Sequence, residues 1–279
     1  MPKGISINIG LRTAGGDCCS LQTLTGSEND AREMARLARC DFIVRGPLLG
    51  GNATRRNVER ELGRAAGELT AGDLLLLTYS GHGCRIFDEP PLEEPDLYDE
   101  TWCLADEQFR DDHLHRRLAA FAEGVRILVI SDSCHSGSIV FRAADRRLSP
   151  ATSGQLKALR ERRRQARSTT LKVSGPCESP KEIENLRLPL SRSGVSIRAS
   201  VLLIAACREE QKAKDGDPNG LFTSALVRLW ADGSFPGTYV EFIRQLHDEV
   251  SGRKPDQKPG WACDGVFDPA FLFQTPFTI

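Results

Sequence analysis

The sequence of 279 residues lacks several features that would define a class of protein at once. No apolar run approaches the roughly 20 residues that a membrane-spanning helix needs. A charge excess is also missing, because 37 lysines and arginines face 38 acidic residues, so bulk charge favours neither a nucleic acid nor a membrane as partner. The first eleven residues have neither the basic start nor the apolar stretch of a secretory signal. These absences predict a cytoplasmic protein with no membrane partner.

Cysteine is abundant, but the spacing that marks many metal and redox sites is missing. The chain has nine cysteines, and no two of them form a C-x-x-C motif. A zinc ribbon or a thioredoxin-like site is therefore disfavoured. In a reducing compartment most cysteines behave as small buried hydrophobic residues. The odd count predicts that at least one of them has a different function.

Hydrophobic periodicity predicts strands that alternate with helices. The strands are predicted at 4–11, 42–44, 74–79, 125–130 and 201–205, and 74–79 and 201–205 are apolar runs typical of strands buried on both faces. Helices are predicted at 27–40, 55–69, 112–123, 220–231 and 238–250. Ser27 is the expected cap of the first helix. This order predicts an α/β fold with a mainly parallel central sheet and helices on both faces.

Two of the predicted strands end in chemically reactive residues. One runs into Tyr79-Ser-Gly-His-Gly83, and another runs into Asp132-Ser-Cys-His-Ser-Gly137. Ligands of parallel sheets bind at the carboxyl ends of the strands, so we expect Cys134 and His82 to form a nucleophile and its base. For either residue alone, a buried structural thiol or a loop histidine is the alternative interpretation.

These two motifs, in this order along the chain, resemble those of the caspase-like cysteine peptidases, and most closely the metacaspase and prokaryotic orthocaspase branch. Further segments fit the same pattern, namely Leu24–Asp30, Asn52–Asn57, Gly72–Asp73, Ala206–Gln211 and Gly220–Leu226. The ordered set is far more specific than any single segment. The resemblance implies one caspase-haemoglobinase domain, with a large catalytic part at 1–141, a connection at 142–198 and a small part at 199–279.

The resemblance implies a cysteine endopeptidase that hydrolyses peptide bonds through a thioacyl enzyme. Cys134 is then the nucleophile, His82 is the general base and acid, and the N–H groups of Gly83 and Cys134 form the oxyanion hole. No third triad member is expected. Two other functions stay open. One is a latent caspase-like effector of a bacterial stress or defence cascade that an upstream protease activates, and the other is a caspase-like binding scaffold without catalysis.

Specificity for basic residues is a second implication, since metacaspases resemble trypsin in this respect. Asp132 lies two residues before the nucleophile, so strand alternation points both side chains the same way. Asp30 matches the other acidic residue of the family's pocket. Two converging carboxylates repel each other, and a guanidinium relieves this repulsion and is held better than an ammonium. Ser80 and Ser27 are expected in the wall of this S1 pocket, and the expected partners are proteins with Arg, or less favourably Lys, at P1.

An acidic segment lies between the two motifs, with seven acidic residues among the thirteen from Asp88 to Glu100. Many metacaspases need calcium, and calcium prefers hard oxygen ligands. The implied calcium ligands are Asp111 and Asp112, with Asp96 or Asp99 as companions. The family's further aspartate after the nucleophile motif has no counterpart in the segment 138–142, which argues against calcium activation. No cofactor is expected to be required, and calcium stays an open alternative.

The connection at 142–198 is rich in basic residues, with 14 lysines and arginines against five acidic residues. A solvated linker is one interpretation. Cleavage by the enzyme itself or by an upstream protease is another, because an arginine-directed peptidase would find substrate sequences there. A nucleic-acid contact is the least favoured interpretation. The candidate processing sites are Arg160, Arg162, Arg163, Arg164 and Arg167.

Overall fold

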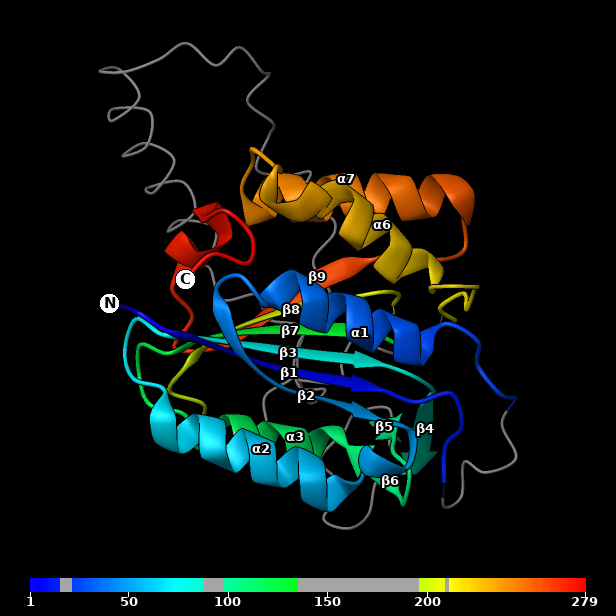
Figure 1. The fold of residues 1–279 in the computed structure, drawn as a ribbon, viewed down its shortest axis with the longest axis horizontal. Coiled ribbons are helices and arrows are strands. Elements are labelled where there is room, and N and C mark those ends of the chain that lie inside the picture. Colours follow the sequence, from blue (N-terminus) through cyan, green and yellow to red (C-terminus); the bar gives the residue numbers. More distant parts are fainter. Residues whose placement is uncertain (16–21, 88–97, 135–195, 209–210) are drawn as a thin grey trace.

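A six-stranded sheet forms the centre of the molecule (Figure 1). The structure is a computed structural model that describes residues 1–15, 22–87, 98–134, 196–208 and 211–279. In sheet order, the strands are β2 (Phe42–Leu49), β1 (Gly4–Gly10), β3 (Leu74–Ser80), β7 (Arg126–Asp132), β8 (Ser200–Ala205) and β9 (Gly260–Gly265). Neighbouring strands pair in parallel except at one edge, where β9 runs antiparallel to β8. The predicted α/β fold with a mainly parallel sheet is confirmed.

Helices cover both faces of this sheet (Figure 1). One face carries α1 (Ser27–Ala38), α6 (Leu221–Trp230) and α7 (Tyr239–Arg253), and the other carries α2 (Arg55–Glu68) and α3 (Asp111–Leu118). Short 3-10 helices are η2 (Gly50–Asn52), η4 (Ala231–Gly233) and η5 (Pro269–Phe273). The chain therefore crosses from one layer to the other several times, as parallel connections require.

Alternation along the strands assigns each core residue to one of two hydrophobic layers. In β3, Leu75 and Leu77 pack with the residues of α2 and α3, whereas Leu74 and Leu76 pack with those of α1, α6 and α7. All four side chains are fully buried. Burying a leucine contributes roughly 1.5–3 kcal/mol, so such two-sided strands fix the position of the residues that follow them.

A small antiparallel sheet, which the hydrophobic pattern did not predict, lies beyond the end of β3. It consists of β4 (Gly83–Phe87), β5 (Tyr98–Cys103) and β6 (Gln108–Arg110). The buried ring of Trp102 in β5 stacks on the buried ring of Tyr79 in β3, with ring centroids 4.6 Å apart. This stacking attaches the small sheet to the central one.

Two helix ends differ from the sequence-based predictions. Ser27 is the first residue of α1 rather than its cap, because Gly26 occupies the N-cap and the Ser27 hydroxyl donates to the carbonyl of Leu11 at 2.5 Å. The third predicted helix ends at Leu118, five residues early. The chain leaves the helix there and places Phe121 in the core, fully buried.

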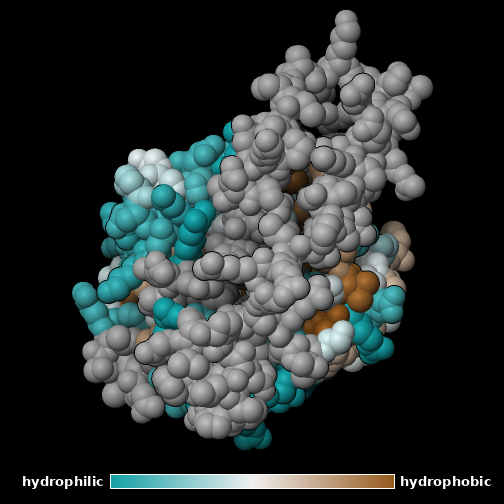
Figure 2. Space-filling model, turned by 180° about the vertical axis from the view of Figure 1, so that it is seen from behind, coloured by the Kyte–Doolittle hydropathy of each residue, from teal (hydrophilic) through white to brown (hydrophobic). Residues whose placement is uncertain are grey.

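The described surface is mainly hydrophilic when the molecule is seen from behind (Figure 2). Large exposed hydrophobic side chains include Ile43 and Val266. Within the described residues, none of the helices combines the length and the apolar character that crossing a membrane would require.

Candidate active site

The two reactive motifs meet at the carboxyl ends of the neighbouring strands β3 and β7. Ser80 is paired with Asp132 in the sheet, so His82 and Cys134 each follow two residues beyond this pair. A Cβ atom on Gly83 would lie only 2.0 Å from the carbonyl oxygen of Cys134. The backbones of the two motifs are therefore in contact, and only a glycine fits at this position.

The imidazole of His82 is held by a main-chain carbonyl that sequence reasoning did not identify. Its Nε2 atom lies 2.6 Å from the carbonyl oxygen of Gln22. A carbonyl can only accept a hydrogen bond, so Nε2 carries the hydrogen and, in the neutral ring, Nδ1 is left as the acceptor. The hydroxyl of Tyr79 donates to the carbonyl of His82 at 2.7 Å, which fixes the backbone of the same residue.

Cys134 is half-buried directly after β7. Burial raises the pKa of its thiol, although a hydrogen bond from the backbone of Ala213 and the positive charge of Lys212 counteract part of this increase. A raised pKa keeps the sulfur protonated at neutral pH. Such a thiol needs a base before it can act as a nucleophile.

Asp30 and Asp132 are the two buried carboxylates at this edge of the sheet, 2% and 7% exposed. Asp30 accepts hydrogen bonds from the Ser80 hydroxyl at 2.8 Å and from the Asn219 amide at 2.7 Å. Asp132 accepts from the hydroxyl of Thr223 at 2.7 Å and from its backbone N–H at 3.2 Å. All these donors are neutral, so the carboxylates are positioned without being neutralised.

Gly220 lies between the two carboxylates. A Cβ atom there would lie 3.0 Å from Oδ2 of Asp132 and 3.2 Å from Oδ2 of Asp30, so any side chain would crowd both groups. The backbone N–H of Gly220 also donates to Oδ1 of Asp30 at 3.1 Å. The structure thus brings both predicted pocket residues together around one glycine at the start of α6.

The protonation of this pair is unusual. Burial, followed by the charge of Asp30, raises the pKa of Asp132 to about 7, and burial raises the pKa of Asp30 to about 6. Neither carboxylate belongs to an ion pair in the part of the chain that the structure describes. An arriving cation would favour the ionised form of both groups.

Ser27 and Ser80, the predicted wall residues, lie in different surroundings. Ser80 contacts Asp30 directly. Ser27 has no exposed surface, and its hydroxyl is hydrogen-bonded to the backbone of Leu11. Of the two serines, Ser80 is the one whose hydroxyl contacts a pocket carboxylate.

The segment before α6 completes the arrangement, and sequence reasoning did not identify its Asp215 and Asn219. Asp215 accepts hydrogen bonds from the backbone N–H groups of Thr25 and Gly26, at 2.6 and 3.0 Å, and so caps α1 where Gly26 offers no side chain. Asn219 accepts from the amide of Asn29 at 3.1 Å while it donates to Asp30. The residues 211–220 therefore join α6 to the start of α1.

The implied calcium ligands are only partly within the described residues. Asp111 is buried at the start of α3, where it accepts a hydrogen bond from the backbone of Asp112 at 2.8 Å. Asp99 lies in β5 by its backbone, and neither its side chain nor Asp96 is among the described groups. The described residues contain no cluster of three or more His, Cys, Asp or Glu able to hold a metal ion. The five candidate processing arginines also lie outside the described residues.

Comparison with known proteins agrees with this arrangement. The family model of the caspase domain, peptidase C14, matches residues 16–271. The chain belongs to the caspase domain family.

Several curated proteins that are similar to this caspase-family chain are metacaspases. Metacaspase-1 of Schizosaccharomyces pombe is 26% identical over 238 residues, which are 77% of this chain and 55% of that protein. Metacaspase-8 of Arabidopsis thaliana is 37% identical over 97 residues, 31% of this chain and 23% of that protein. The chain therefore spans little more than half the length of the Schizosaccharomyces pombe metacaspase.

Solved structures share the whole fold. The crystal structure of a Geobacter sulfurreducens protein, 37% identical, superposes with a TM-score of 0.70 and covers 100% of this chain and 99% of its own. Caspase-1 of Spodoptera frugiperda, 11% identical, has a TM-score of 0.53 and covers 95% and 89% of the two chains. The caspase fold that the sequence motifs implied is therefore confirmed.

Proposed function

We propose that this caspase-family chain is a cysteine endopeptidase that cleaves proteins after arginine, and less efficiently after lysine. The observation that carries the specificity is the pair of buried carboxylates, Asp30 and Asp132, whose hydrogen-bond donors among the described residues are all neutral and which lies beside Cys134. A planar guanidinium can donate to both carboxylates at once, whereas an ammonium acts as a point charge. An acidic P1 side chain would add a third negative charge to a buried site, and we expect it to be rejected.

The proposed chemistry uses the groups at the ends of β3 and β7. Nδ1 of His82 takes the proton of the Cys134 thiol, and the sulfur attacks the carbonyl carbon of the scissile bond. The N–H groups of Gly83 and Cys134 donate to the oxygen of the tetrahedral intermediate. His82 then gives its proton to the leaving amine, and the thioacyl enzyme is hydrolysed by a water molecule that His82 deprotonates.

The Gln22 carbonyl supports this assignment of roles. It accepts from Nε2 of His82, so it favours the ring orientation in which Nδ1 is available for the thiol. The same contact stabilises the imidazolium that forms when the thiol loses its proton. The carbonyl thus orients the imidazole as the carboxylate does in a Ser-His-Asp triad.

Activation by cleavage within 142–198 remains part of the proposal. The pocket combines Asp30 and Asp132 of the large part with Asn219 and Gly220 of the small part. A cut in the connection could therefore change the pocket without removing any of its side chains. Replacing the five candidate arginines by Gln should leave the chain uncut and lower its activity. Unchanged activity of an uncut chain would contradict activation by cleavage.

The deciding experiment compares matched fluorogenic peptides that end in Arg, Lys or Asp. Wild type and Cys134→Ala are assayed side by side in reducing buffer, once with calcium and once with chelator. We expect cleavage after Arg that Cys134→Ala abolishes, and the chelator lanes decide calcium dependence. Cleavage after Asp would contradict the pocket assignment. If no peptide is cleaved, the chain is first cut within 142–198 by another protease, and inactivity of the cut chain would contradict the proposed activity.

A further inference from the structure

Two cysteines outside the proposed catalytic pair lie against each other on the small sheet. The sulfur of Cys84 in β4 is 3.3 Å from the sulfur of Cys103 in β5. Cys84 pairs with Thr101 in the antiparallel register, so Cys103 is its diagonal neighbour on the same face of the sheet. The two sulfurs of a disulfide are about 2.05 Å apart, so a shift of roughly 1.2 Å would bring these sulfurs to bonding distance.

The two thiols differ in their access to solvent. Cys103 has no exposed surface, whereas Cys84 is only partly buried. An oxidant dissolved in water therefore reaches Cys84 first and finds Cys103 behind it. An accessible thiol with a second thiol at contact distance is the arrangement in which oxidation ends in a disulfide rather than in higher sulfur acids.

This pair is attached to the proposed catalytic histidine. Cys84 is two residues after His82, and the backbone N–H of Cys103 donates to the carbonyl of His82 at 3.0 Å. The hydroxyl of Tyr79 donates to the carbonyls of both His82 and Cys103, at 2.7 and 3.1 Å. A displacement of β4 against β5 is therefore passed to the backbone of His82 and Gly83.

We propose that Cys84 and Cys103 form a reversible disulfide that slows the peptidase when the chain meets a hydroperoxide. The Cys84 thiolate attacks one peroxide oxygen, which gives a sulfenic acid on Cys84 and releases an alcohol, or water from hydrogen peroxide. The Cys103 thiol then attacks the sulfenic sulfur, the S–S bond forms and a water molecule leaves. The two thiols together lose two electrons and two protons, and the peroxide gains them. A dithiol reductant restores both thiols by exchange and is itself oxidised to a disulfide.

The effect on the rate rests on the proposed function, whereas the disulfide does not. Bond formation pulls β4 toward β5 and moves His82 and Gly83 relative to Cys134. Misplacement of catalytic groups by about 1 Å can cost up to about a hundredfold in rate, so we expect a fall of about tenfold in kcat. Asp30 and Asp132 are held by residues of the central sheet and of α6. The KM for an arginine substrate should therefore change little.

The first test detects the bond without any need for activity. Full-length Cys134→Ala is treated with hydrogen peroxide, free thiols are blocked, and peptides are mapped under non-reducing conditions. We expect a peptide pair linked through Cys84 and Cys103, lost in Cys84→Ala, lost in Cys103→Ala and lost after dithiothreitol. Cys40, an exposed thiol, reports the oxidant dose. Oxidation of Cys40 without any link between Cys84 and Cys103 would overturn the proposal.

The second test measures the effect of the disulfide on kcat. The otherwise wild-type chain and Cys84→Ala receive the same peroxide dose, and each is compared with its own activity in reductant. We expect the chain with both thiols to lose about tenfold more kcat, and dithiothreitol to restore it. A linked chain with unchanged kcat would overturn the effect on the peptidase. A chain that is inactive in both redox states, and still inactive after a cut within 142–198, would overturn the proposed function, while the peptide map would still show whether the disulfide forms.

Discussion

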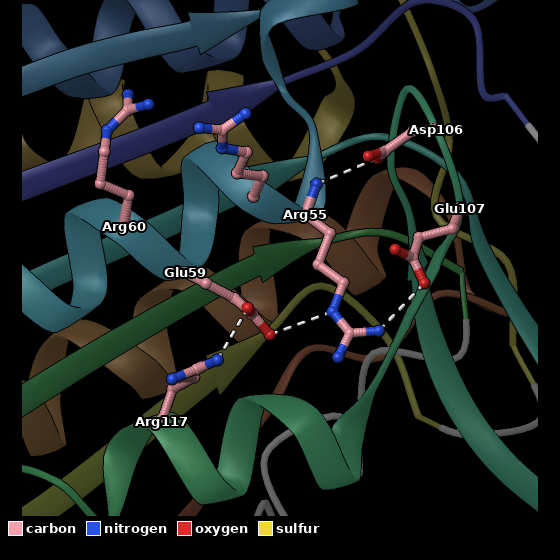
Figure 3. A pocket seen from close by; sticks show the side chains of 7 residues that line it. Arg55, Glu59, Arg60, Asp106, Glu107 and Arg117 are labelled. Atoms are coloured by element: carbon pink, nitrogen blue, oxygen red, sulfur yellow. Dashed lines mark hydrogen bonds and ion pairs between the residues drawn. The ribbon is translucent and has the colours of Figure 1, made fainter.

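Two clusters of charged side chains among the described residues differ in how their charges are compensated. The arginine cluster lies between α2, α3 and the turn before β6 and lines an open pocket of about 440 Å³ (Figure 3). Its residues are Arg55, Arg56, Glu59, Arg60, Asp106, Glu107 and Arg117. In it Arg55 is ion-paired with Glu59 at 3.0 Å and with Glu107 at 3.1 Å, and Arg117 pairs with Glu59 at 2.7 Å. Partial burial would raise the pKa of Glu59, but the two arginines hold it below its ordinary value.

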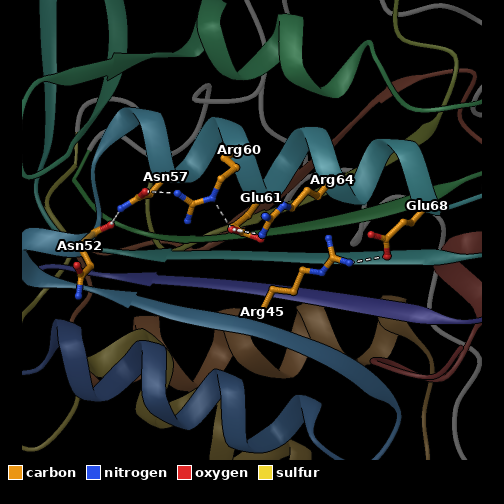
Figure 4. Close-up of polar contacts among 7 residues, drawn as sticks. All are labelled: Arg45, Asn52, Asn57, Arg60, Glu61, Arg64 and Glu68. Carbon is orange, nitrogen blue, oxygen red and sulfur yellow. Dashed lines mark hydrogen bonds and ion pairs between the residues drawn. The ribbon is translucent and has the colours of Figure 1, made fainter.

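Ion pairs between arginines and glutamates continue along α2 (Figure 4). Arg60 and Arg64 both pair with Glu61, and Arg45 of β2 pairs with Glu68 near the end of the helix. Opposite charges alternate along this side of the helix. Such partly solvated pairs contribute little individually.

The proposed acidic pocket, around Asp30 and Asp132, is the opposite case. Its charges are buried, of one sign and held by neutral donors, and both pKa values are raised. A third carboxylate, Asp215, adds to the repulsion. Charge number therefore does not distinguish the proposed binding site from a structural cluster. The distinguishing feature is a buried charge whose counter-charge the described residues do not supply.

Asp132→Asn is expected to have the largest effect. Removing one partner of a buried charge pair costs about 2–5 kcal/mol, so kcat/KM for an arginine peptide should fall by about thirtyfold or more. The unfolding midpoint should stay the same or rise, since the repulsion with Asp30 is removed while the amide oxygen can still accept from Thr223. Steady-state kinetics and thermal unfolding of the same preparation measure both quantities.

The arginine cluster offers the matched control for this prediction. Glu59→Gln weakens two ion pairs on the surface, so it should lower the unfolding midpoint slightly and leave kcat/KM unchanged. The opposite signs of the two stability changes are the informative result. An Asp132→Asn chain with full activity would refute the proposed role of the acidic pocket.

The pH dependence of guanidinium binding is expected to be the next largest effect. An arginine amide binds the ionised pair, so its affinity for Cys134→Ala should rise as pH increases through about 6 and about 7, the raised pKa values of Asp30 and Asp132. Titration calorimetry between pH 5 and pH 8 (roughly the range in which such groups titrate) measures this directly. An affinity that does not change over this range would contradict the coupling between protonation and binding.

The stability of the unliganded chain should change with pH in the opposite direction. Both folded-state pKa values lie above the ordinary 3.8, so the folded chain binds more protons than the unfolded chain between these values. The stabilisation is fully present below about pH 4 and is lost as pH rises through the folded values. Relative to Asp132→Asn, wild type should therefore lose unfolding free energy as pH rises, and denaturant titrations at several pH values measure it.

A smaller effect is expected for Asp215→Asn. This carboxylate caps α1 and places Asn219 and Gly220 against Asp30, so its loss should raise KM for arginine peptides by about tenfold, with little change in kcat. Removing such a cap costs about 1 kcal/mol of stability. Asp217→Asn, two residues away and exposed, is the control, and it should change neither the KM nor the stability. If kcat fell while KM stayed constant, the residue would act on the catalytic groups instead of the pocket.

The sequence alone predicted five of the six central strands, because β3, β7 and β8 are largely apolar runs whose burial on both faces leaves little choice of structure, and β1 alternates isoleucine with polar residues. The small sheet was not predicted, since β4 to β6 are three to six residues long and β5 carries charged residues between apolar ones. The edge strand β9 was also not predicted. It has six residues and begins and ends with glycine.

The predictability of the candidate site depended on whether a side chain or the backbone carries the contact. Asp132, Cys134 and His82 stand in recognisable motifs at strand ends. The contact of the Gln22 carbonyl with His82 cannot be identified from the sequence, because every residue has a backbone carbonyl. Asp215 stands in an ordinary polar segment, and its partners Thr25 and Gly26, just before α1, lie 190 and 189 residues away in sequence, so only the folded chain shows its role.

Glu68→Gln should have the smallest effect of all. Its carboxylate pairs with Arg45 at the solvent-facing end of α2, and the hydrogen bond from Arg45 lowers its pKa. The stabilisation is therefore present above the ordinary pKa of a glutamate and is lost as pH falls through the lowered value. At neutral pH the variant should unfold at a slightly lower temperature, and the difference should disappear in about 1 M salt, where charges are screened within about 3 Å. The kinetics should be unchanged, because the pair is far along α2 from the acidic pocket and is compensated within itself. Altered kcat/KM in this variant would mean that the compensated side of the molecule is coupled to the site, and the contrast between the two clusters would then fail.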